Sequence, residues 1–306
     1  MTSSRLDRSY ILPLGFAMTV SMWAVAYVCR LPAVMAPSWL VLGLMLAAVA
    51  LWGWATGLRT GDGWLGGMMV GAAAAVVNML ILGSVLASAD GGGVVPSALW
   101  WVPGSILVIA LVSGGFAAAP GRRLDQVTDP ADWTALFSKV AVAATFLLVV
   151  AGGLVTSNEA GLAVVDWPNT FGSNMFLFPL TRMTGGIYYE HAHRLFGALV
   201  GLTTIVLAVR LWRRDDRKWL HWLAAAAVVL VILQCMLGGL RVTGGFTLST
   251  SPEDTAPNLI LALVHGVLGQ IFLAVIVAIA AVGEIVEALL AAGADRNLAN
   301  NGGSTS

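Results

Sequence analysis

Long apolar segments separated by short polar breaks fill most of this 306-residue chain. A membrane-spanning helix needs about 20 predominantly apolar residues. The pattern therefore predicts eight transmembrane helices, at residues 10–29, 38–57, 64–88, 97–118, 137–156, 186–209, 219–240 and 258–282. The breaks between them contain glycine, proline or charged residues, which are typical of turns. The first apolar run follows Arg5 and Arg8 as a signal peptide would, but it is long and lacks an A-x-A exit, so we interpret it as an anchor helix.

Composition supports an all-α integral membrane protein. Hydrophobic residues make up 58% of the chain and charged residues 10%, whereas soluble domains carry about 25% charged residues. The net charge is zero, so nothing indicates a nucleic-acid partner. Cys29 and Cys235 both fall in apolar runs without a nearby partner, and we expect no disulfide.

Basic residues predict the orientation in the membrane. Twelve lie on the same side of the membrane as the N-terminus, namely Arg5, Arg8, Arg59, Arg122, Arg123, Lys139, Arg210, Arg213, Arg214, Arg217, Lys218 and Arg296. Four lie on the opposite side, namely Arg30, Arg182, Arg194 and Arg241. The positive-inside rule then places both termini in the cytoplasm, and the protein in a bacterial-type inner membrane.

The polar segment GRRLDQVTDPADW suggests a division of the chain. We predict an N-terminal four-helix membrane domain at 1–120, a cytoplasmic linker at 121–135, a second four-helix bundle at 136–282 and a cytoplasmic tail at 283–306. The N-terminal spans contain no histidine, and only Asn78 is conspicuously polar, so nothing there indicates a reaction. The tail resembles the second helix and turn of an ankyrin repeat. One repeat cannot bury its own apolar face, so the tail is either a fragment of an array or a chance match in an amphipathic segment.

Two histidines carry the functional prediction. His193 and His265 each lie about 10 Å below the outer ends of the sixth and eighth predicted spans, at 1.5 Å per residue. Both spans run in the same direction, so a four-helix bundle can present the two imidazoles to opposite faces of one haem. The alternative is that each histidine hydrogen-bonds a neighbouring carbonyl. Five glycines leave room for a flat ring: Gly197, Gly238, Gly239, Gly266 and Gly269. His191 is interpreted as an interfacial or supporting residue.

Four segments resemble the haem A synthase family in the same order: GGLVTSNEAGLAVVDWPNTFG at 152–172, EHAHR at 190–194, LQCMLGGLRV at 233–242 and the helix of His265. The resemblance covers about residues 136–282. It implies a membrane monooxygenase that converts the C8 methyl of haem O to a formyl group, for assembly of a terminal oxidase. The implied cofactor is haem with its iron, as haem O or A or as haem B. The alternative function is a bis-histidine cytochrome that only transfers electrons.

The resemblance also implies roles for single residues. His193 and His265 match the iron ligands of one four-helix half of the family. Glu190 matches a glutamate near the reacting haem edge and is the candidate catalytic residue; the alternative is an interfacial carboxylate paired with Arg194 or Arg182. Arg194 and Arg241 are candidate haem-binding residues, and Arg241 could equally be a helix-end arginine that reaches the interface. Gln234 is interpreted as a helix–helix contact.

This chain departs from the family in two ways. Many members carry a cysteine pair in the loop before EHAHR, where this chain has Val164, Val165 and Thr170. We still expect an ordered loop, because Asp166, Trp167 and Pro168 combine turn formers with an aromatic anchor. Larger members also have a second histidine-bearing half, which this chain lacks. One haem site per chain suggests a homo-oligomer, and haem O synthase or oxidase assembly factors are candidate partners.

Overall fold

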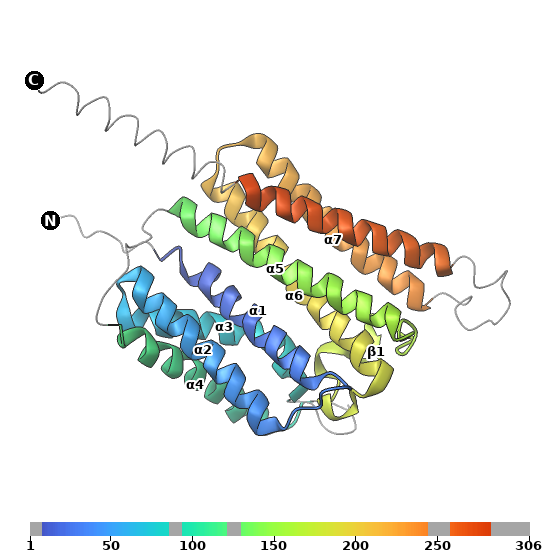
Figure 1. Ribbon diagram of the computed structural model, residues 1–306, viewed down its shortest axis with the longest axis horizontal. Coiled ribbons are helices and arrows are strands. Elements are labelled where there is room, and N and C mark those ends of the chain that lie inside the picture. Colours follow the sequence, from blue (N-terminus) through green and yellow to red (C-terminus); the bar gives the residue numbers. More distant parts are fainter. Residues whose placement is uncertain (1–7, 86–93, 121–129, 244–257, 283–306) are drawn as a thin grey trace, which may run out of the picture.

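The computed structural model describes residues 8–85, 94–120, 130–243 and 258–282. The described residues form eight α-helices, one short hairpin and two 3-10 turns. Seven helices are labelled in chain order in Figure 1: α1 (Ile11–Arg30), α2 (Ser38–Thr60), α3 (Gly63–Val85), α4 (Ala98–Ala118), α5 (Pro130–Ser157), α6 (Gly185–Arg214) and α7 (Lys218–Thr243). The eighth, Asn258–Val282, is the 258–282 helix.

The helices confirm an all-α membrane protein. Seven of them are long and apolar enough to cross a bilayer, and in α3 the apolar stretch found is the shorter Gly63–Met79. The start of α5 differs most from the prediction, because α5 begins at Pro130, inside the expected linker. Proline suits the first position of a helix, where its missing N–H costs no hydrogen bond. The rest of the expected linker and the tail at 283–306 lie outside the described residues.

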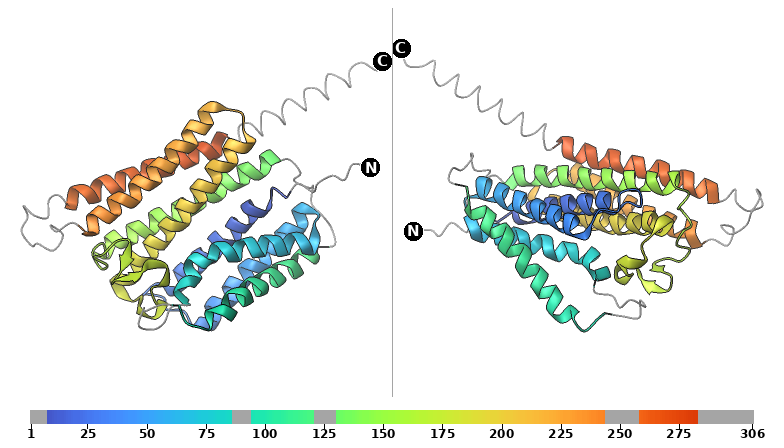
Figure 2. Two further views of the ribbon diagram at one scale, coloured as in Figure 1. Left: turned by 180° about the vertical axis from the view of Figure 1, so that it is seen from behind. Right: turned by 60° about the horizontal axis from the view of Figure 1, so that its bottom comes forward.

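The helices form two groups that share α1. Figures 1 and 2 show α2, α3 and α4 on one side of α1, and α5, α6, α7 and the 258–282 helix on the other. Within the first group, small residues allow close approach of α2 and α4. A Cβ atom added at Gly53 or Gly57 would collide with the α4 backbone at Ser113 or Ala117. The close contact of α2 and α4 therefore depends on these two glycines.

Asn78 is the polar centre of the first group. Its side chain is buried, with 3% exposure. The Trp23 indole N–H of α1 donates a hydrogen bond of 2.8 Å to the Asn78 Oδ1 of α3. A buried amide is costly without a partner, so this bond explains how Asn78 is accommodated within the apolar helices.

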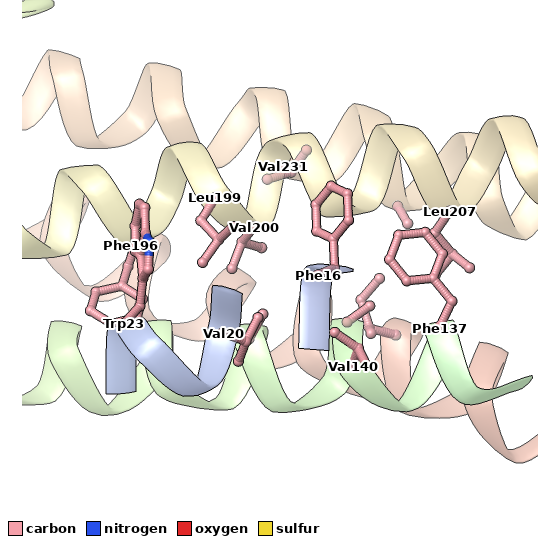
Figure 3. Close-up of a cluster of buried hydrophobic side chains, with 14 of the residues drawn as sticks. Phe16, Val20, Trp23, Phe137, Val140, Phe196, Leu199, Val200, Leu207 and Val231 are labelled. Atoms are coloured by element: carbon pink, nitrogen blue, oxygen red, sulfur yellow. The ribbon is translucent and has the colours of Figure 1, made fainter. Parts of the chain in front are cut away.

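Aromatic side chains of α1 also pack into the second group. Figure 3 shows Phe16 and Trp23 of α1 in one cluster with Phe137 of α5 and Phe196 of α6. The Phe16 and Phe137 ring centroids are 5.2 Å apart, and those of Trp23 and Phe196 are 5.4 Å apart. Both pairs are edge-to-face, a favourable aromatic geometry. The two predicted four-helix units are therefore joined along α1.

A buried arginine joins the two helix groups near the N-terminal end of α1. Arg210 of α6 donates from Nη1 to the Ser9 carbonyl oxygen at 2.9 Å and from Nε to the Thr134 hydroxyl at 2.9 Å. These bonds join α6 to the start of α1 and to α5. A planar guanidinium can bridge three segments in this way because its donors point in fixed directions.

Candidate functional site

His193 of α6 and His265 of the 258–282 helix lie side by side. Their ring centroids are 6.3 Å apart and their planes are inclined at 85°. The structure thus brings together the two histidines that were predicted to meet, at the end of the bundle that carries the loop between α5 and α6.

The spacing of the two rings fits a shared metal ion. An imidazole nitrogen binds a transition metal at about 2.0–2.1 Å, so two imidazoles on opposite sides of one ion have centroids about 6–6.5 Å apart. The observed 6.3 Å lies in this range. Nδ1 of His193 and Nδ1 of His265 are both buried without a hydrogen-bond partner among the described residues. Buried polar atoms rarely lack partners, so these two nitrogens are available to a ligand. Each ring also meets a backbone carbonyl group, that of Leu148 for His193 and that of Gln234 for His265, as the alternative prediction expected.

The bundle is loosely packed at the same level. The 258–282 helix has no buried residue between Asn258 and Phe272, whereas Phe272, Ile276 and Ile279 are buried farther along. A Cβ atom added at Gly197 or Gly266 would meet nothing within 4 Å. The part of the 258–282 helix that carries His265 therefore packs less closely against the bundle than the part around Phe272 does.

Not every glycine predicted to leave room does so. A Cβ atom at Gly238 would lie 3.5 Å from the His265 ring, which is ordinary contact, and one at Gly269 would lie 3.9 Å from Gln234. One at Gly239 would lie 2.6 Å from the Trp167 indole. For Gly239 the prediction was wrong, because the loop between α5 and α6 reaches α7 and fills the space.

Gly152 of α5 was missed at the sequence level. A Cβ atom there would lie 3.0 Å from Cε1 of His193. The α5 backbone thus forms the wall behind the His193 ring, and only glycine leaves the ring its place. The neighbouring Gly153 has nothing within 4 Å, so the paired glycines in the sequence gave no sign of which one mattered.

Glu190 is a buried carboxylate near His193 on α6. Its exposure is 6%, and its Oε1 accepts a hydrogen bond of 3.1 Å from Nε of Arg194. Glu190 and His193 are three residues apart, so they lie on the same side of the helix. The pairing with Arg194 matches one of the two partners expected, but the burial shows that Glu190 is not an exposed interfacial residue.

Arg194 also holds the loop between α5 and α6, residues 158–184, called here the α5–α6 loop. Its Nη1 donates to the carbonyl oxygens of Asp166 at 2.7 Å and Asn169 at 3.0 Å. Its Nη2 donates to the carbonyl oxygen of Val164 at 2.7 Å. Arg194 was a candidate haem-binding residue, and the structure gives it contacts to the loop backbone and to Glu190.

The α5–α6 loop is ordered, as predicted. It contains β1 (Asn169–Thr170) and β2 (Ser173–Asn174), which pair antiparallel, and two 3-10 turns, η1 (Met175–Leu177) and η2 (Leu180–Arg182). Phe171 and Gly172 in the hairpin turn both have positive φ, as the tight turns favoured in hairpins require. The Asp166 carboxylate accepts hydrogen bonds from both of their N–H groups, at 2.8 and 2.7 Å.

His191 lies beneath this loop and is not interfacial. Its exposure is 0%. Its Nδ1 is 3.1 Å from the Thr170 hydroxyl oxygen, and its ring lies 5.1 Å from that of Phe178. Of the two interpretations, burial fits the supporting residue and not an exposed interfacial one, because the loop folds back and covers this face of α6.

Arg241 lies close to the histidine pair. It lies three residues after Gly238 on α7, where an added Cβ atom would be 3.5 Å from the His265 ring. Its Nε donates to Oδ1 of Asn258 at a long 3.4 Å. Asn258 was not predicted as a site residue. The only sign of it in the sequence is a polar residue at the start of a helix. The Arg241 guanidinium lies against the α5–α6 loop, since a Cβ atom added at Gly161 would collide with its Nη2.

Gln234 makes the helix–helix contact that the sequence suggested. Its Nε2 donates to the backbone carbonyl oxygen of His265 at 3.1 Å. The bond joins α7 to the 258–282 helix beside the histidine pair. It therefore fixes the backbone that carries the His265 ring.

The comparison with known families agrees with this geometry. A sequence model of the COX15-CtaA family, described as cytochrome oxidase assembly protein, matches residues 135–298. The match covers more than half of the chain, and the chain belongs to this family. It includes α5, α6, α7 and the 258–282 helix, and it runs into the segment interpreted as ankyrin-like.

Curated relatives point the same way. The heme A synthase of Caulobacter vibrioides is 30% identical over 168 residues, which are 46% of this chain and 48% of that protein. The heme A synthase of Lysinibacillus sphaericus is 30% identical over 111 residues, 36% of this chain and 35% of that protein. A protoheme IX farnesyltransferase of Haloarcula marismortui is 30% identical over 142 residues, 46% of this chain and 28% of that protein. The chain thus matches about half or less of the length of these relatives. No solved structure matches it.

Proposed function

We propose that this protein is a haem A synthase-like monooxygenase, which converts the C8 methyl of haem O to a formyl group for terminal oxidase assembly. The observation that carries the proposal is the 6.3 Å separation of the His193 and His265 rings. The heme A synthases among its relatives support the same reaction. The bundle of α5, α6, α7 and the 258–282 helix would be the haem domain, and α1 to α4 a membrane domain that supports it.

The residues of the site have distinct proposed roles. His193 and His265 would hold the haem through its iron, and the bound haem would supply the redox chemistry. Glu190 would accept and return protons near the reacting edge. A carboxylate within the membrane is costly, and such residues usually mark functional sites. Arg241 pairs with a haem propionate through its planar guanidinium.

The charge distribution supports an orientation for this site. With both termini in the cytoplasm of a bacterial-type inner membrane, the α5–α6 loop and the histidine pair lie toward the outer face. Haem O would then enter from the outer half of the bilayer. The described residues offer one histidine pair per chain, so a second haem that donates electrons would be held by another copy in a homo-oligomer. Haem O synthase and oxidase assembly factors are the proposed partners.

Identification of the extracted haem tests the proposal. The protein is expressed with and without a haem O synthase, and its haem is identified by chromatography and mass spectrometry. We expect formyl haem in wild type, and unchanged haem O bound at normal occupancy in Glu190→Ala. A bis-histidine cytochrome, which the imidazole pair would serve equally well, predicts unchanged haem in both. That result would contradict the enzyme proposal.

A further inference from the structure

The turn of α6 that follows Glu190 fastens the α5–α6 loop at two residues, His191 and Arg194. His191 meets the loop at the Thr170 hydroxyl, 3.1 Å from Nδ1. Arg194 meets it at the carbonyl oxygens of Val164, Asp166 and Asn169, at 2.7 to 3.0 Å. The loop contains no cysteine, so only non-covalent contacts hold it to α6.

The same arginine holds the carboxylate. Arginine has five N–H donors in a rigid plane. In Arg194 the Nε donor is engaged by Glu190, and Nη1 and Nη2 make the three bonds to the loop. The side chains of Arg194 and Glu190 are both 8% exposed. In such a place neither partner exchanges its bonds for water cheaply, so the loop backbone and Glu190 are joined through one rigid group.

We propose that Arg194 is a positioning residue, which couples the seating of the α5–α6 loop to the orientation of the Glu190 carboxylate. The inference rests on the proposed function only in giving Glu190 a catalytic role. When the loop is seated, the guanidinium is fixed by three carbonyl oxygens and presents Nε to Oε1 of Glu190. When the loop lifts, the guanidinium loses those bonds and the carboxylate loses its fixed direction. Arg194 therefore acts through Glu190 and the loop, without direct contact with haem.

Hydrogen exchange measured by mass spectrometry in the purified full-length protein tests the coupling without haem conversion. Arg194→Lys keeps the charge but loses the planar donors, and we expect exchange in residues 158–184 to quicken about ten-fold or more. Glu190→Ala removes the carboxylate, and none of the hydrogen bonds described for Glu190 reaches the loop. Coupling through Arg194 nevertheless predicts faster loop exchange in this variant, because coupled sites affect each other reciprocally. Arg213→Gln, an exposed change on the same helix, is the control and should leave exchange unchanged.

Thr170→Val adds a milder test that does not depend on the stability of an arginine variant. It removes the hydroxyl that meets His191 and keeps the volume nearly constant. We expect loop exchange about three- to ten-fold faster, a kcat for formyl haem formation lowered by a similar factor, and an unchanged KM.

Two results would overturn the inference: loop exchange that is unchanged in Arg194→Lys or Glu190→Ala, or a Thr170→Val loop that loosens with no change in kcat. If wild type forms no formyl haem, the proposed function fails, while the exchange results in Arg194→Lys and Glu190→Ala still decide the coupling.

Discussion

The Tyr188 hydroxyl of α6 donates a hydrogen bond of 2.6 Å to the carbonyl oxygen of Tyr27 in α1. Both residues are buried, and their rings stack with centroids 5.7 Å apart. Tyr188→Phe keeps the stacking and removes the bond, which leaves a buried carbonyl oxygen without this partner. We expect the free energy of unfolding in detergent to fall by about 1–2 kcal/mol, measured by thermal or denaturant unfolding.

Tyr189→Phe is the matched control for Tyr188→Phe. Tyr189 is the next residue on α6 and is only partly buried. No hydrogen bond from its hydroxyl is found among the described residues. Its loss should change stability by less than about 0.5 kcal/mol. Equal effects of the two substitutions would show that the Tyr188–Tyr27 bond does not stabilise the contact between α1 and α6.

Gly152 and Gly153 provide a test of the wall behind His193. A Cβ atom at Gly152 would lie 3.0 Å from the His193 ring, whereas at Gly153 it would meet nothing within 4 Å. Gly152→Val should displace the imidazole and weaken haem binding about ten-fold, because overpacking costs about 1–3 kcal/mol. Gly153→Val should bind haem as wild type does. Haem titration of the two purified proteins measures the two affinities. Equal affinities would contradict the contact between Gly152 and the His193 ring.

Gly239 of α7 and Trp167 of the α5–α6 loop lie in close contact. Because a Cβ atom at Gly239 would lie 2.6 Å from the indole, Gly239→Ala should destabilise the protein by about 1–3 kcal/mol. In a Trp167→Ala background the same change should be neutral or slightly stabilising, since alanine favours a helix over glycine. Unfolding of all four proteins gives the coupling energy. Additive effects would mean that the indole does not rest on Gly239.

Helix positions could be predicted well from the sequence, and helix ends less well. The span predicted at 186–209 continues as α6 to Arg214. A hydropathy window stops at the first charged residues, but a helix continues while its side chains reach the headgroups or water. The same effect lengthens α5 toward Pro130. These errors do not move the histidines, whose depth depends on the apolar stretch itself.

The histidine pair could be predicted because it depends on helix direction and depth alone. The contacts of Arg194 could not, because its loop partners are backbone carbonyl oxygens, which leave no mark in a sequence. The packing of α1 on both helix groups was equally hidden. A helix surface that faces protein can be as apolar as one that faces lipid, so Phe16 and Trp23 did not indicate their partners.

The most direct test is the spectrum of the purified protein with haem bound. We expect a Soret band and a low-spin ferric electron paramagnetic resonance signal of two imidazole ligands. His193→Ala and His265→Ala should each lose the low-spin signal, and His221→Ala, outside the site, should keep it. A colourless wild-type protein, or a low-spin signal that survives both site substitutions, would contradict haem binding between His193 and His265.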